Sequence, residues 1–279
     1  MKKISRRSFL AAAGLSVAAL ALTACGGSSA STASSVASSA ASSEAASTSA
    51  AAGELTTVEA GKLTMATNAA FPPYEMTTDA GEFEGIDIET AQAIADKLGL
   101  ELQSDDMDFD AALLSVQQGK ADIVMAGVTV TDERKAVMDF SDSYATGIQS
   151  IIVPEGSDIA SPDDLAGKKI GTQRGTTGYI YCSDDFGDDN VVAYDDGLTA
   201  VQALNNGQVD AVVIDNAPAQ EFVAANPGLK ILDTSYAEED YAIGMAKGSS
   251  LEDAVNATLE ELKADGTLQS IVDKYITAE

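Results

Sequence analysis

Two stretches of the chain, ALLSVQQGKADIVMAG at residues 112–127 and AVQALNNGQVDAVVID at residues 200–215, match each other without a gap. Each copy has a helical pattern of apolar residues, then a glycine, two further residues, an aspartate and an apolar run typical of a buried strand. Three pairs of positions align between the copies: Gly119 with Gly207, Asp122 with Asp210, and Gly127 with Asp215. Because the copies begin 88 residues apart, at positions 112 and 200, they predict two lobes built to the same plan.

The rest of the chain alternates strand-like and helix-like segments, which is the pattern of an α/β fold with mostly parallel sheets. A helix is predicted over residues 87–99, ending at a capping glycine, and one or two helices are predicted over residues 251–276. Strands are predicted by the apolar runs at residues 63–67, 121–127, 168–172, 210–215 and 241–246.

In open α/β sheets, ligands bind at the carboxyl ends of the strands, where the loops converge. The two equivalent strand ends in the repeated units are Gly127 and Asp215. A duplication without any binding site would also explain the repeat. We favour the interpretation in which both strand ends face one shared cleft.

The segment AGVTVTDER at residues 126–134 has the pattern of a strand end followed by a helix start. Arg134 falls in the first turn of that helix, where the positive end of the macrodipole disfavours a cation. An arginine beside free backbone N–H groups makes a strong carboxylate site, so Arg134 and the N–H of Thr129 are candidate anion-binding groups. Spacing alone equally allows Arg134 to pair on the surface with a neighbouring acid: Asp132, Glu133 or Asp139.

A second helix start, QRGTTGYIY at residues 173–181, contains glycines that let backbone N–H groups turn toward an anion. Asp215, at the end of a buried strand, is a carboxylate suited to a cation. A small anion site facing a small cation site matches the zwitterion of an α-amino acid. FPPYEM at residues 71–76 and Phe109 would supply aromatic walls around a side chain, although ordinary core packing explains any single aromatic residue better.

Residues 1–24 have the features of a secretory signal peptide, with the basic segment MKKISRR and an apolar run too short to span a membrane comfortably. LTAC followed by two glycines resembles the lipobox of bacterial lipoproteins, which implies cleavage before Cys25 and a lipid on its thiol. An ordinary secretory signal with a chance cysteine is the alternative. SRRSFL fits a twin-arginine signal or a plain basic segment. Residues 25–54 are mostly Ser and Ala and are predicted to be a flexible tether.

The chain carries 44 acidic and 16 basic residues, a formal net charge of -28. Cleavage of the signal would remove four basic residues and no acid, which changes this charge to -32. Such an acidic protein is a poor match for nucleic acid, and its folded surface is a poor match for anionic lipid.

The composition also argues against a metal or another cofactor. The chain has no histidine and two cysteines, and lipidation of Cys25 would leave Cys182 without a partner for a disulfide. Zinc and most transition-metal sites are therefore excluded in practice, and the commonest general base is missing. The run DDFGDD at residues 184–189 does not have the spacing of an EF-hand and is better interpreted as a solvated acidic loop.

Together these residues resemble the polar amino-acid-binding proteins of ABC importers. The resemblance covers about residues 60–277 and rests on ATNAAFPPYEM, GEFEGIDIETAQAIADKLG, MDFDAALLSVQQGKADIVMAGVTVTDERKAVMDFSDSY, QRGTTG and ELKADGTLQSIVDKY. The run AG-x-T-x-T-x-x-R…DFS is specific to this solute-binding superfamily, whereas any one of the other segments would be weak on its own.

The resemblance implies a two-lobed, periplasmic-binding-protein-like (type II) α/β fold with two hinge crossovers, closing on its ligand. Lobe 1 would comprise residues 55–147 and 240–279, and lobe 2 residues 148–239. The protein would be a monomer, anchored by lipid on the outer face of the bacterial cell membrane. It would deliver an amino acid to the membrane permease of the importer.

By the same resemblance, Arg134 would bind the carboxylate of the amino acid, assisted by the backbone N–H groups of Thr129 and Thr177. Asp215 would bind its ammonium group, beside the hydroxyl of Thr129 and the carbonyl of Gly127. No catalytic residue is implied.

Four further positions would surround the ligand side chain. Phe71 and Phe109 would lie on its two sides, and Asn68 and Gln173 would read its polar end. Relatives that take basic amino acids, and some that take glutamine, carry aspartate where this chain has Asn68. A neutral amide favours a neutral polar side chain, and glutamine is our first choice.

One enzymatic alternative exists, because some relatives became cyclohexadienyl (arogenate or prephenate) dehydratases on the same scaffold. That chemistry needs a positioned general acid. The absence of histidine and the pairing of Arg134 with Asp215 favour amino-acid binding instead. A role in sensing, through a neighbouring receptor, is a further alternative.

Overall fold

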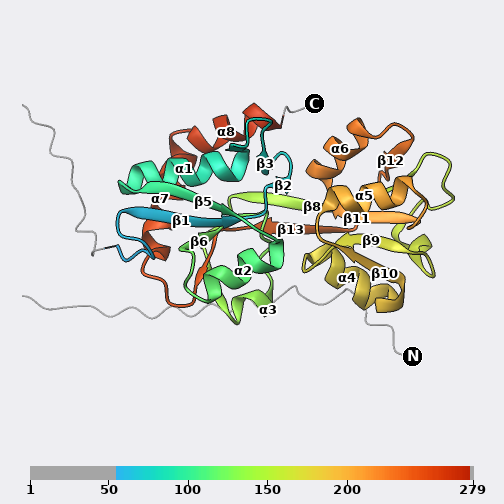
Figure 1. Ribbon diagram of the computed structural model, residues 1–279, viewed down its shortest axis with the longest axis horizontal. Coiled ribbons are helices and arrows are strands. Elements are labelled where there is room, and N and C mark those ends of the chain that lie inside the picture. Colours follow the sequence, from blue (N-terminus) through green and yellow to red (C-terminus); the bar gives the residue numbers. More distant parts are fainter. Residues whose placement is uncertain (1–54, 277–279) are drawn as a thin grey trace, which may run out of the picture. The chain divides into compact units, whose positions relative to one another are not determined.

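The computed structural model describes residues 55–276 (Figure 1). The predicted signal peptide at residues 1–24, the predicted lipidation at Cys25 and the predicted tether at residues 25–54 lie outside the described residues. Between residues 55 and 276, none of the helices has the length and the apolar character needed to cross a membrane.

The first large sheet has the strand order β5-β1-β6-β14-β7. Strands β5 and β6 run parallel to β1, whereas β14 runs antiparallel to both β6 and β7. The strands are β1 (Lys62–Thr67), β5 (Glu101–Asp106), β6 (Ile123–Val124), β7 (Met138–Phe140) and β14 (Gly244–Ala246).

The second large sheet has the order β10-β9-β11-β8-β12, and β13 also pairs with β8. Strands β9, β10 and β11 are parallel, and β8 is antiparallel to all its neighbours. The strands are β8 (Ala145–Pro154), β9 (Ile170–Gln173), β10 (Val191–Tyr194), β11 (Ala211–Asp215), β12 (Leu229–Ile231) and β13 (Ala237–Tyr241). A small antiparallel sheet contains β2 (Ala70–Phe71), β3 (Glu75–Thr77) and β4 (Phe83–Glu84).

Helices cover both faces of the two large sheets, as an α/β fold requires (Figure 1). In the first lobe α1, α7 and α8 pack together, and α2 packs against β1, β6 and β14. In the second lobe α4 and α5 both pack against β9, β10 and β11, and α6 packs against β8 and β12. The helices are α1 (Ile86–Leu98), α2 (Phe109–Gln117), α3 (Asp132–Lys135), α4 (Thr177–Phe186), α5 (Gly197–Asn205), α6 (Asn216–Ala225), α7 (Glu252–Ala264) and α8 (Thr267–Tyr275), with 3₁₀ turns at Pro162–Leu165 and Asp188–Asn190.

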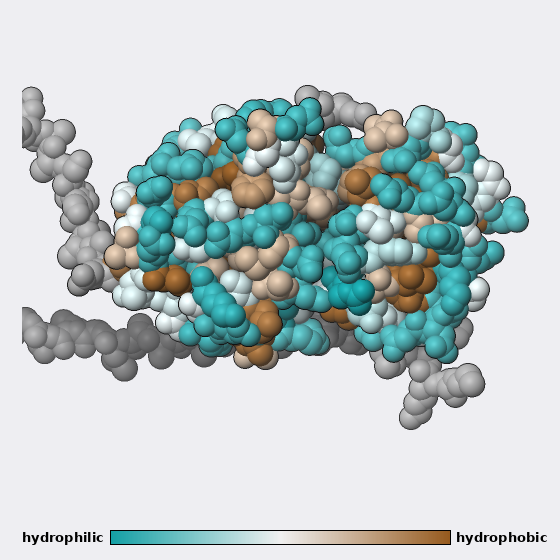
Figure 2. Space-filling model, viewed as in Figure 1, coloured by the Kyte–Doolittle hydropathy of each residue, from teal (hydrophilic) through white to brown (hydrophobic). Residues whose placement is uncertain are grey.

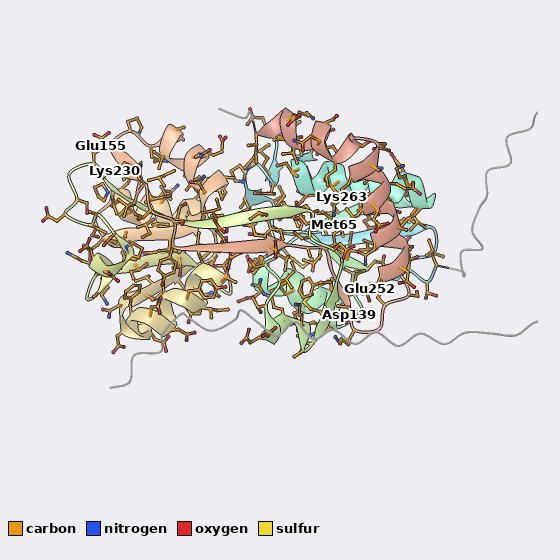
Figure 3. All side chains as sticks on the ribbon, turned by 180° about the vertical axis from the view of Figure 1, so that it is seen from behind. Met65, Asp139, Glu155, Lys230, Glu252 and Lys263 are labelled. Atoms are coloured by element: carbon orange, nitrogen blue, oxygen red, sulfur yellow. The ribbon has the colours of Figure 1, made fainter. Side chains whose placement is uncertain are left out.

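Two neighbouring strands carry the chain between the lobes. β8 leads into the second sheet, and β13 leads back toward β14 in the first sheet. They pair antiparallel, with Gly147 opposite Glu239, and they run side by side across the middle of Figures 1 and 3. The expected two-lobed α/β fold with two crossovers is therefore confirmed.

The repeated units end their helices in the same way. Gly119 and Gly207 both have left-handed backbones, with φ +65° and +67°, and each follows the capping residue at the end of its helix, α2 or α5. Their N–H groups donate to the carbonyls of Val116 and Leu204, each at 3.0 Å. A positive φ favours glycine because it has no side chain to clash, which explains why both copies need glycine here.

The aligned aspartates also have the same function in both units. Asp122 accepts a hydrogen bond from the backbone N–H of Thr64 at 2.7 Å, and Asp210 accepts one from the N–H of Lys169 at 2.8 Å. Thr64 lies in β1, and Lys169 immediately precedes β9. Each aspartate therefore fixes the strand that follows its helix to the neighbouring parallel strand.

The predicted strand at residues 121–127 is shorter than expected, because only β6 (Ile123–Val124) has regular strand geometry. The flanking backbone still bonds to β1, since the N–H of Met125 donates to the carbonyl of Ala66 at 3.2 Å. The chain then turns at Gly127, whose φ is +55°, and this turn ends the strand.

The predicted strand at residues 241–246 is divided in two. Tyr241 ends β13 in the second sheet and Gly244 begins β14 in the first, so the chain changes sheets between them. Ala242, at this change, donates its N–H to the carbonyl of Val128 at 3.1 Å. The predicted helical region at residues 251–276 forms two helices, separated at Gly266 with φ +80°.

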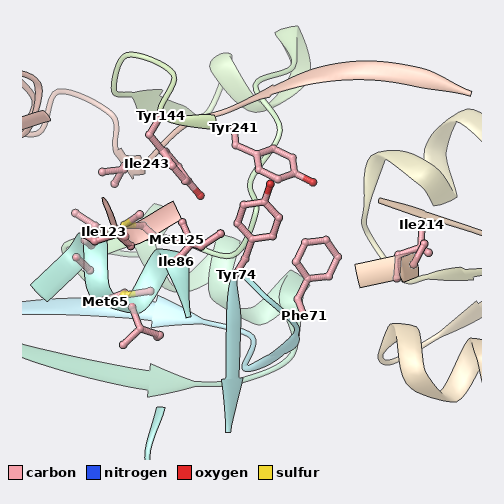
Figure 4. Packing of buried hydrophobic residues seen from close by; sticks show 14 of the residues in the cluster. Met65, Phe71, Tyr74, Ile86, Ile123, Met125, Tyr144, Ile214, Tyr241 and Ile243 are labelled. Atoms are coloured by element: carbon pink, nitrogen blue, oxygen red, sulfur yellow. The ribbon is translucent and has the colours of Figure 1, made fainter. Parts of the chain in front are cut away.

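In the core of the first lobe, Tyr144 lies among aliphatic residues and methionines, and Phe71, Tyr74 and Tyr241 lie on the side toward Ile214 of the second lobe (Figure 4). Met65, Ile123 and Met125 are fully buried in the interior. The rings of Tyr74 and Tyr241 lie edge to face with centroids 5.3 Å apart. On the outside, hydrophilic residues cover most of the face in Figure 2, as the strongly acidic composition requires.

Candidate functional site

A cavity lies between the lobes, at the carboxyl ends of β1, β6, β9 and β11. Both aligned strand ends of the repeated units, Gly127 and Asp215, line it, so the expected shared cleft is present. Every residue that the sequence predicted for the site lines this cavity: Asn68, Phe71, Phe109, Gly127, Thr129, Arg134, Gln173, Thr177 and Asp215. The other lining residues are Glu75, Ala126, Gln149, Thr176, Val213 and Ile214.

Arg134 is buried in the wall of the cavity, with 8% of its surface exposed. Its guanidinium donates to the carbonyl of Thr129 at 2.8 Å and to the carbonyl of Gly175, in the other lobe, at 3.1 Å. The same group lies over the ring of Phe109, 5.3 Å from its centroid. Burial lowers the pKa of Arg134, and the negative charge of Glu239 opposes that shift.

None of the ion pairs within residues 55–276 includes Arg134. Asp139, one of its proposed surface partners, instead pairs with Lys247 at 2.6 Å. The surface interpretation of Arg134 is therefore wrong. A buried cation without a paired carboxylate is costly, and an anion entering the cavity would relieve that cost.

The helix that contains Arg134 is shorter than the dipole argument assumes. α3 is a single turn, and the Thr131 hydroxyl caps it by accepting from the backbone N–H of Arg134 at 3.2 Å. One turn produces only a small macrodipole. The helix dipole therefore has little effect on Arg134. The main effect of its position in α3 is that its guanidinium points into the protein.

The second predicted helix start is present in α4. Thr176 caps this helix by accepting from the N–H of Tyr179 at 3.4 Å, and Thr177 is its first residue. The first N–H groups of a helix have no acceptor within the helix, so they are available to an anion. The hydroxyl of Thr177 is committed elsewhere, since it donates to Glu239 at 2.9 Å.

Asp215 is the buried carboxylate of the site, with 7% of its surface exposed. One oxygen accepts from the side-chain amide of Gln149 at 2.7 Å, and the other is buried without a hydrogen-bond partner among the described residues. Burial raises the pKa of Asp215 to about 7, and the charge of Glu239 acts in the same direction. Such a carboxylate strongly favours a cation beside it.

Phe71 and Phe109 are both cavity-lining and core residues, with 8% and 6% of their surfaces exposed. Phe71 lies directly against the backbone of Gly127, where an added Cβ would approach its ring to 2.8 Å. The N–H of Gly127 donates to Asp87 at 3.0 Å. Glycine at position 127 is thus required by both the positive φ and the aromatic ring.

Asn68 and Gln173 contact each other across the cleft. The amide of Gln173, at the end of β9, donates to the side-chain oxygen of Asn68 at 2.8 Å. The amide of Asn68 donates in turn to the carbonyl of Met107 at 2.9 Å. This end of the cavity is therefore lined by two neutral amides that hold each other in place.

Three buried polar residues of the site were not identified from the sequence: Glu75, Gln149 and Glu239. Gln149 and Glu239 lie on the crossover strands, and the position of a crossover strand relative to a cleft has no local motif. A cue existed for Gln149, which interrupts the apolar run GIQSIIV. None existed for Glu239, which lies in a run of acids that has the pattern of an exposed surface.

Glu75 and Asp87 form a buried acidic pair beside the cavity, and both are fully buried. Burial raises the pKa of Glu75 well above its ordinary value and that of Asp87 to about 6. Asp87 accepts hydrogen bonds from the N–H of Gly127 and from the hydroxyl of Tyr144, the latter at 2.7 Å. Asp87 therefore holds the Gly127 turn, and burial shifts Glu75 toward its neutral form.

Two lobes that present their strand ends to one polar cavity define the class of two-lobed solute-binding proteins. The family model of the bacterial extracellular solute-binding proteins, family 3, matches residues 63–278. The chain belongs to this family.

Named relatives and solved structures agree with this assignment. The chain is 33% identical over 276 residues to the probable histidine-binding protein of Neisseria gonorrhoeae, covering 96% of this chain and 95% of that one. It is 33% identical over 226 residues to the L-cystine-binding protein of Escherichia coli, covering 79% and 85%. A solved ancestral arginine-binding protein bound to glutamine is 42% identical with a TM-score of 0.75, covering 78% of this chain and 99% of that one.

Proposed function

We propose that the chain is the amino-acid-binding component of an ABC importer, which captures an L-amino acid with a neutral polar side chain and delivers it to a membrane permease. The observation that carries this proposal is the placement of Arg134 and Asp215. These buried groups of opposite charge come from separate lobes and line one cavity. The names of the relatives, which refer to histidine, cystine and arginine, support an amino-acid ligand.

In this proposal the two lobes divide the zwitterion between them. Arg134 receives the carboxylate, together with the free N–H groups of Thr129 and of Thr177 at the start of α4. Asp215 receives the ammonium group, together with the carbonyl of Gly127 and the hydroxyl of Thr129. Both charged ends of the ligand then meet groups that are otherwise buried without a charged partner, so binding draws the lobes together.

The side chain of the ligand extends between Phe71 and Phe109 toward Asn68 and Gln173. The two amides carry no charge, so they offer hydrogen bonds to a neutral polar group and no compensation for a charged one. Glutamine matches this end of the cavity. Binding rather than dehydratase chemistry is favoured because the relatives described above are named as binding proteins.

The remaining parts of the proposal concern the whole protein. We place the lobe boundaries at residues 147/148 and 239/240, within the paired crossover strands. The protein acts as a monomer, outside the cytoplasm and attached to the membrane through Cys25, and it needs no cofactor. Release of a binding-competent soluble protein after cleavage between residues 25 and 54 would be consistent with this arrangement.

The test is Arg134→Ala, compared with Arg174→Ala as a matched control. Arg174 is exposed at the cleft margin, where it pairs with Asp195 at 3.6 Å. Thermal-shift screening of the wild type against the twenty amino acids identifies the ligand, and calorimetry measures its affinity. We expect Arg134→Ala to lose about 3–5 kcal/mol of binding, and Arg174→Ala to lose less than about 1 kcal/mol.

Two results would refute the proposal. One is a wild type that is stabilised by none of the twenty amino acids. The other is an Arg134→Ala variant whose affinity for every wild-type ligand stays within about threefold of the wild-type value. Removing the cation from a buried carboxylate should weaken binding far more than that.

A further inference from the structure

Glu239 lies on the crossover strand β13, behind residues that line the cavity, and 6% of its surface is exposed. Its neighbours on the strand, Glu238 and Asp240, are exposed. Strand alternation explains this pattern, because successive side chains point to opposite faces. The buried carboxylate therefore points into the protein, where a charge needs a reason to be retained.

A single oxygen of Glu239 collects three hydrogen bonds from three parts of the molecule. It accepts from the hydroxyl of Thr129 in the first lobe at 3.1 Å and from that of Thr177 in the second lobe at 2.9 Å. It also accepts from the amide of Gln149, on the other crossover strand, at 3.0 Å. The same Gln149 amide nitrogen donates to Asp215 at 2.7 Å, so Glu239 and Asp215 share one donor group.

These bonds determine which polar groups remain available to a ligand. A threonine hydroxyl has one hydrogen, so Thr129 and Thr177 give theirs to Glu239 and keep only oxygen lone pairs for other partners. Gln149 gives both amide hydrogens to the two carboxylates. One oxygen of Asp215 and one of Glu239 remain buried without a hydrogen-bond partner among the described residues. Around these two carboxyl groups the described residues are rich in acceptors, and the buried hydroxyl of Tyr241, which interacts with Asp215, is the donor that lies among them.

The charges of the cluster act in the same direction. Asp215 and Glu75 line this cavity and Glu239 lies beside it, hydrogen-bonded to Gln149, whereas Arg134 contributes one guanidinium to its lining. A group that brings several N–H donors and a positive charge satisfies both the empty acceptors and the charge imbalance. A hydroxyl brings one donor and no charge, and a bare methylene brings neither.

We propose that Glu239 is a positioning residue that makes the cleft selective for a protonated amine. By holding the hydroxyls of Thr129 and Thr177 as acceptors and placing a second negative charge near Asp215, it excludes 2-hydroxy acids that share the carboxylate and side chain of the amino acid. The inference rests on the proposed function, because it assigns a residue to the selectivity of the same site.

The experiment compares two ligands in three variants. The ligands are the amino acid with the largest thermal shift among the twenty and the 2-hydroxy acid with the same configuration and side chain. The variants are Glu239→Gln, Glu239→Ala and the control Glu238→Gln, whose side chain is exposed on the same strand. Glutamine has the size of glutamate, and its amide oxygen can accept from the same three donors, so Glu239→Gln tests the charge with the geometry kept.

We expect the wild type to prefer the amino acid over the hydroxy acid by at least about a hundredfold. In Glu239→Gln, affinity for the amino acid falls about tenfold while affinity for the hydroxy acid stays level or rises, so the preference shrinks by about tenfold or more. Glu238→Gln leaves both affinities unchanged. If Glu239→Ala does not fold, the glutamine variant alone decides.

The outcomes separate the inference from the proposed function. A wild type that binds none of the twenty amino acids refutes both. A wild type that binds an amino acid, with the same preference in Glu239→Gln as in the unmodified protein, overturns only the role of Glu239. An equal loss of affinity for both ligands does the same, because it shows that Glu239 supports the fold and does not select the amine.

Discussion

In the repeated unit at residues 112–127 the last residue is Gly127. Its backbone lies at the cleft, and the ring of Phe71 occupies the space that a side chain at this position would need. In the unit at residues 200–215 the last residue is Asp215, which offers a buried carboxylate with one unpartnered oxygen. Upstream of these ends the units agree in detail. Both have a left-handed glycine after the helix and an aspartate that accepts a hydrogen bond from the neighbouring strand.

This difference shows that the scaffold and the chemistry occupy separate positions of the same unit. The glycine and the aspartate recur because they fold the helix–strand connection, and that task is the same in both lobes. The strand end differs because the two lobes must offer different groups to an asymmetric ligand. Substitutions at matched positions should therefore affect binding at the strand ends and stability elsewhere.

The largest effect is expected from Asp215→Ala. The ammonium group would lose its buried counter-charge, and binding should weaken by about 3–5 kcal/mol. The melting temperature of the ligand-free protein should stay level or rise, because an unpartnered buried carboxyl oxygen is removed. Calorimetry and melting curves measure the two effects. A variant that retains wild-type affinity would show that Asp215 lines the cleft but does not bind the ligand.

Stability and ligand affinity should both depend on pH through Asp215, whereas Gly127, the end of the first unit, has no side chain that titrates. The folded-state pKa of Asp215 is raised from its ordinary value of 3.8 to about 7, so its contribution to the stability of the ligand-free protein is present below about pH 4 and is lost as pH rises through about 7. Ligand affinity should change in the opposite sense, because only the ionised carboxylate attracts an ammonium group. It should fall by up to about tenfold for each unit below pH 7.

Melting curves between about pH 5 and 8, with and without the amino acid, check both signs. Asp87, whose pKa is raised to about 6, adds to the decline in stability of the ligand-free protein. Asp215→Ala should abolish most of the pH dependence of affinity and leave the contribution of Asp87 in place. An affinity that rises toward acid would contradict the role of an ionised Asp215.

A smaller effect, on stability alone, is expected from Asp122→Ala and Asp210→Ala. Asp122 is buried and accepts from two backbone N–H groups, of Val58 and Thr64, each at 2.7 Å. Asp210 is exposed and accepts from the N–H of Lys169. We expect losses of about 2–3 kcal/mol for Asp122→Ala and about 1 kcal/mol for Asp210→Ala, with affinity unchanged. Urea unfolding measures them, and equal losses would mean that burial does not distinguish the two units.

The smallest and most symmetrical effect is expected from Gly119→Ala and Gly207→Ala. Within residues 55–276, no atom lies within 4 Å of an added Cβ at either position, so only the left-handed backbone opposes the change. Each should lose about 1 kcal/mol of stability. Gly156→Ala is the control, because it has the same open space without a positive φ, and it should be close to neutral. A marked difference between Gly119→Ala and Gly207→Ala would break the equivalence of the repeated units.

The sequence predicted these shared features well because they are local. The helix end at Gly119, the cap at Thr131 and the strand leading to Asp215 each depend on a few neighbouring residues. Comparison with a known family added distant positions such as Asn68 and Gln173, which approach each other only after both lobes fold. The same comparison carried no information on Glu239.

The errors have a common physical origin in tertiary contacts. The strand expected over residues 241–246 is one apolar run, yet it is divided because the chain passes from one sheet to the other. Arg134 is compatible with a surface ion pair by spacing, and only the folded structure shows that Asp139 already pairs with Lys247. Periodicity indicates which residues are buried, but it does not indicate against which part of the chain.

β14 lies between β6 and β7, although it comes much later in the sequence. This position determines which sheet can form first during synthesis of the chain. Residues 244–246 fill the fourth position of a sheet whose other strands end by residue 140, so a nascent chain that stops before β14 leaves β7 without its partner. The core strands of the second sheet, β8 to β12, all lie between residues 145 and 231. The second lobe, although synthesised later, therefore has its core strands complete before the first lobe does. The sheet of the first lobe lacks its fourth strand until residues 244–246 have been synthesised.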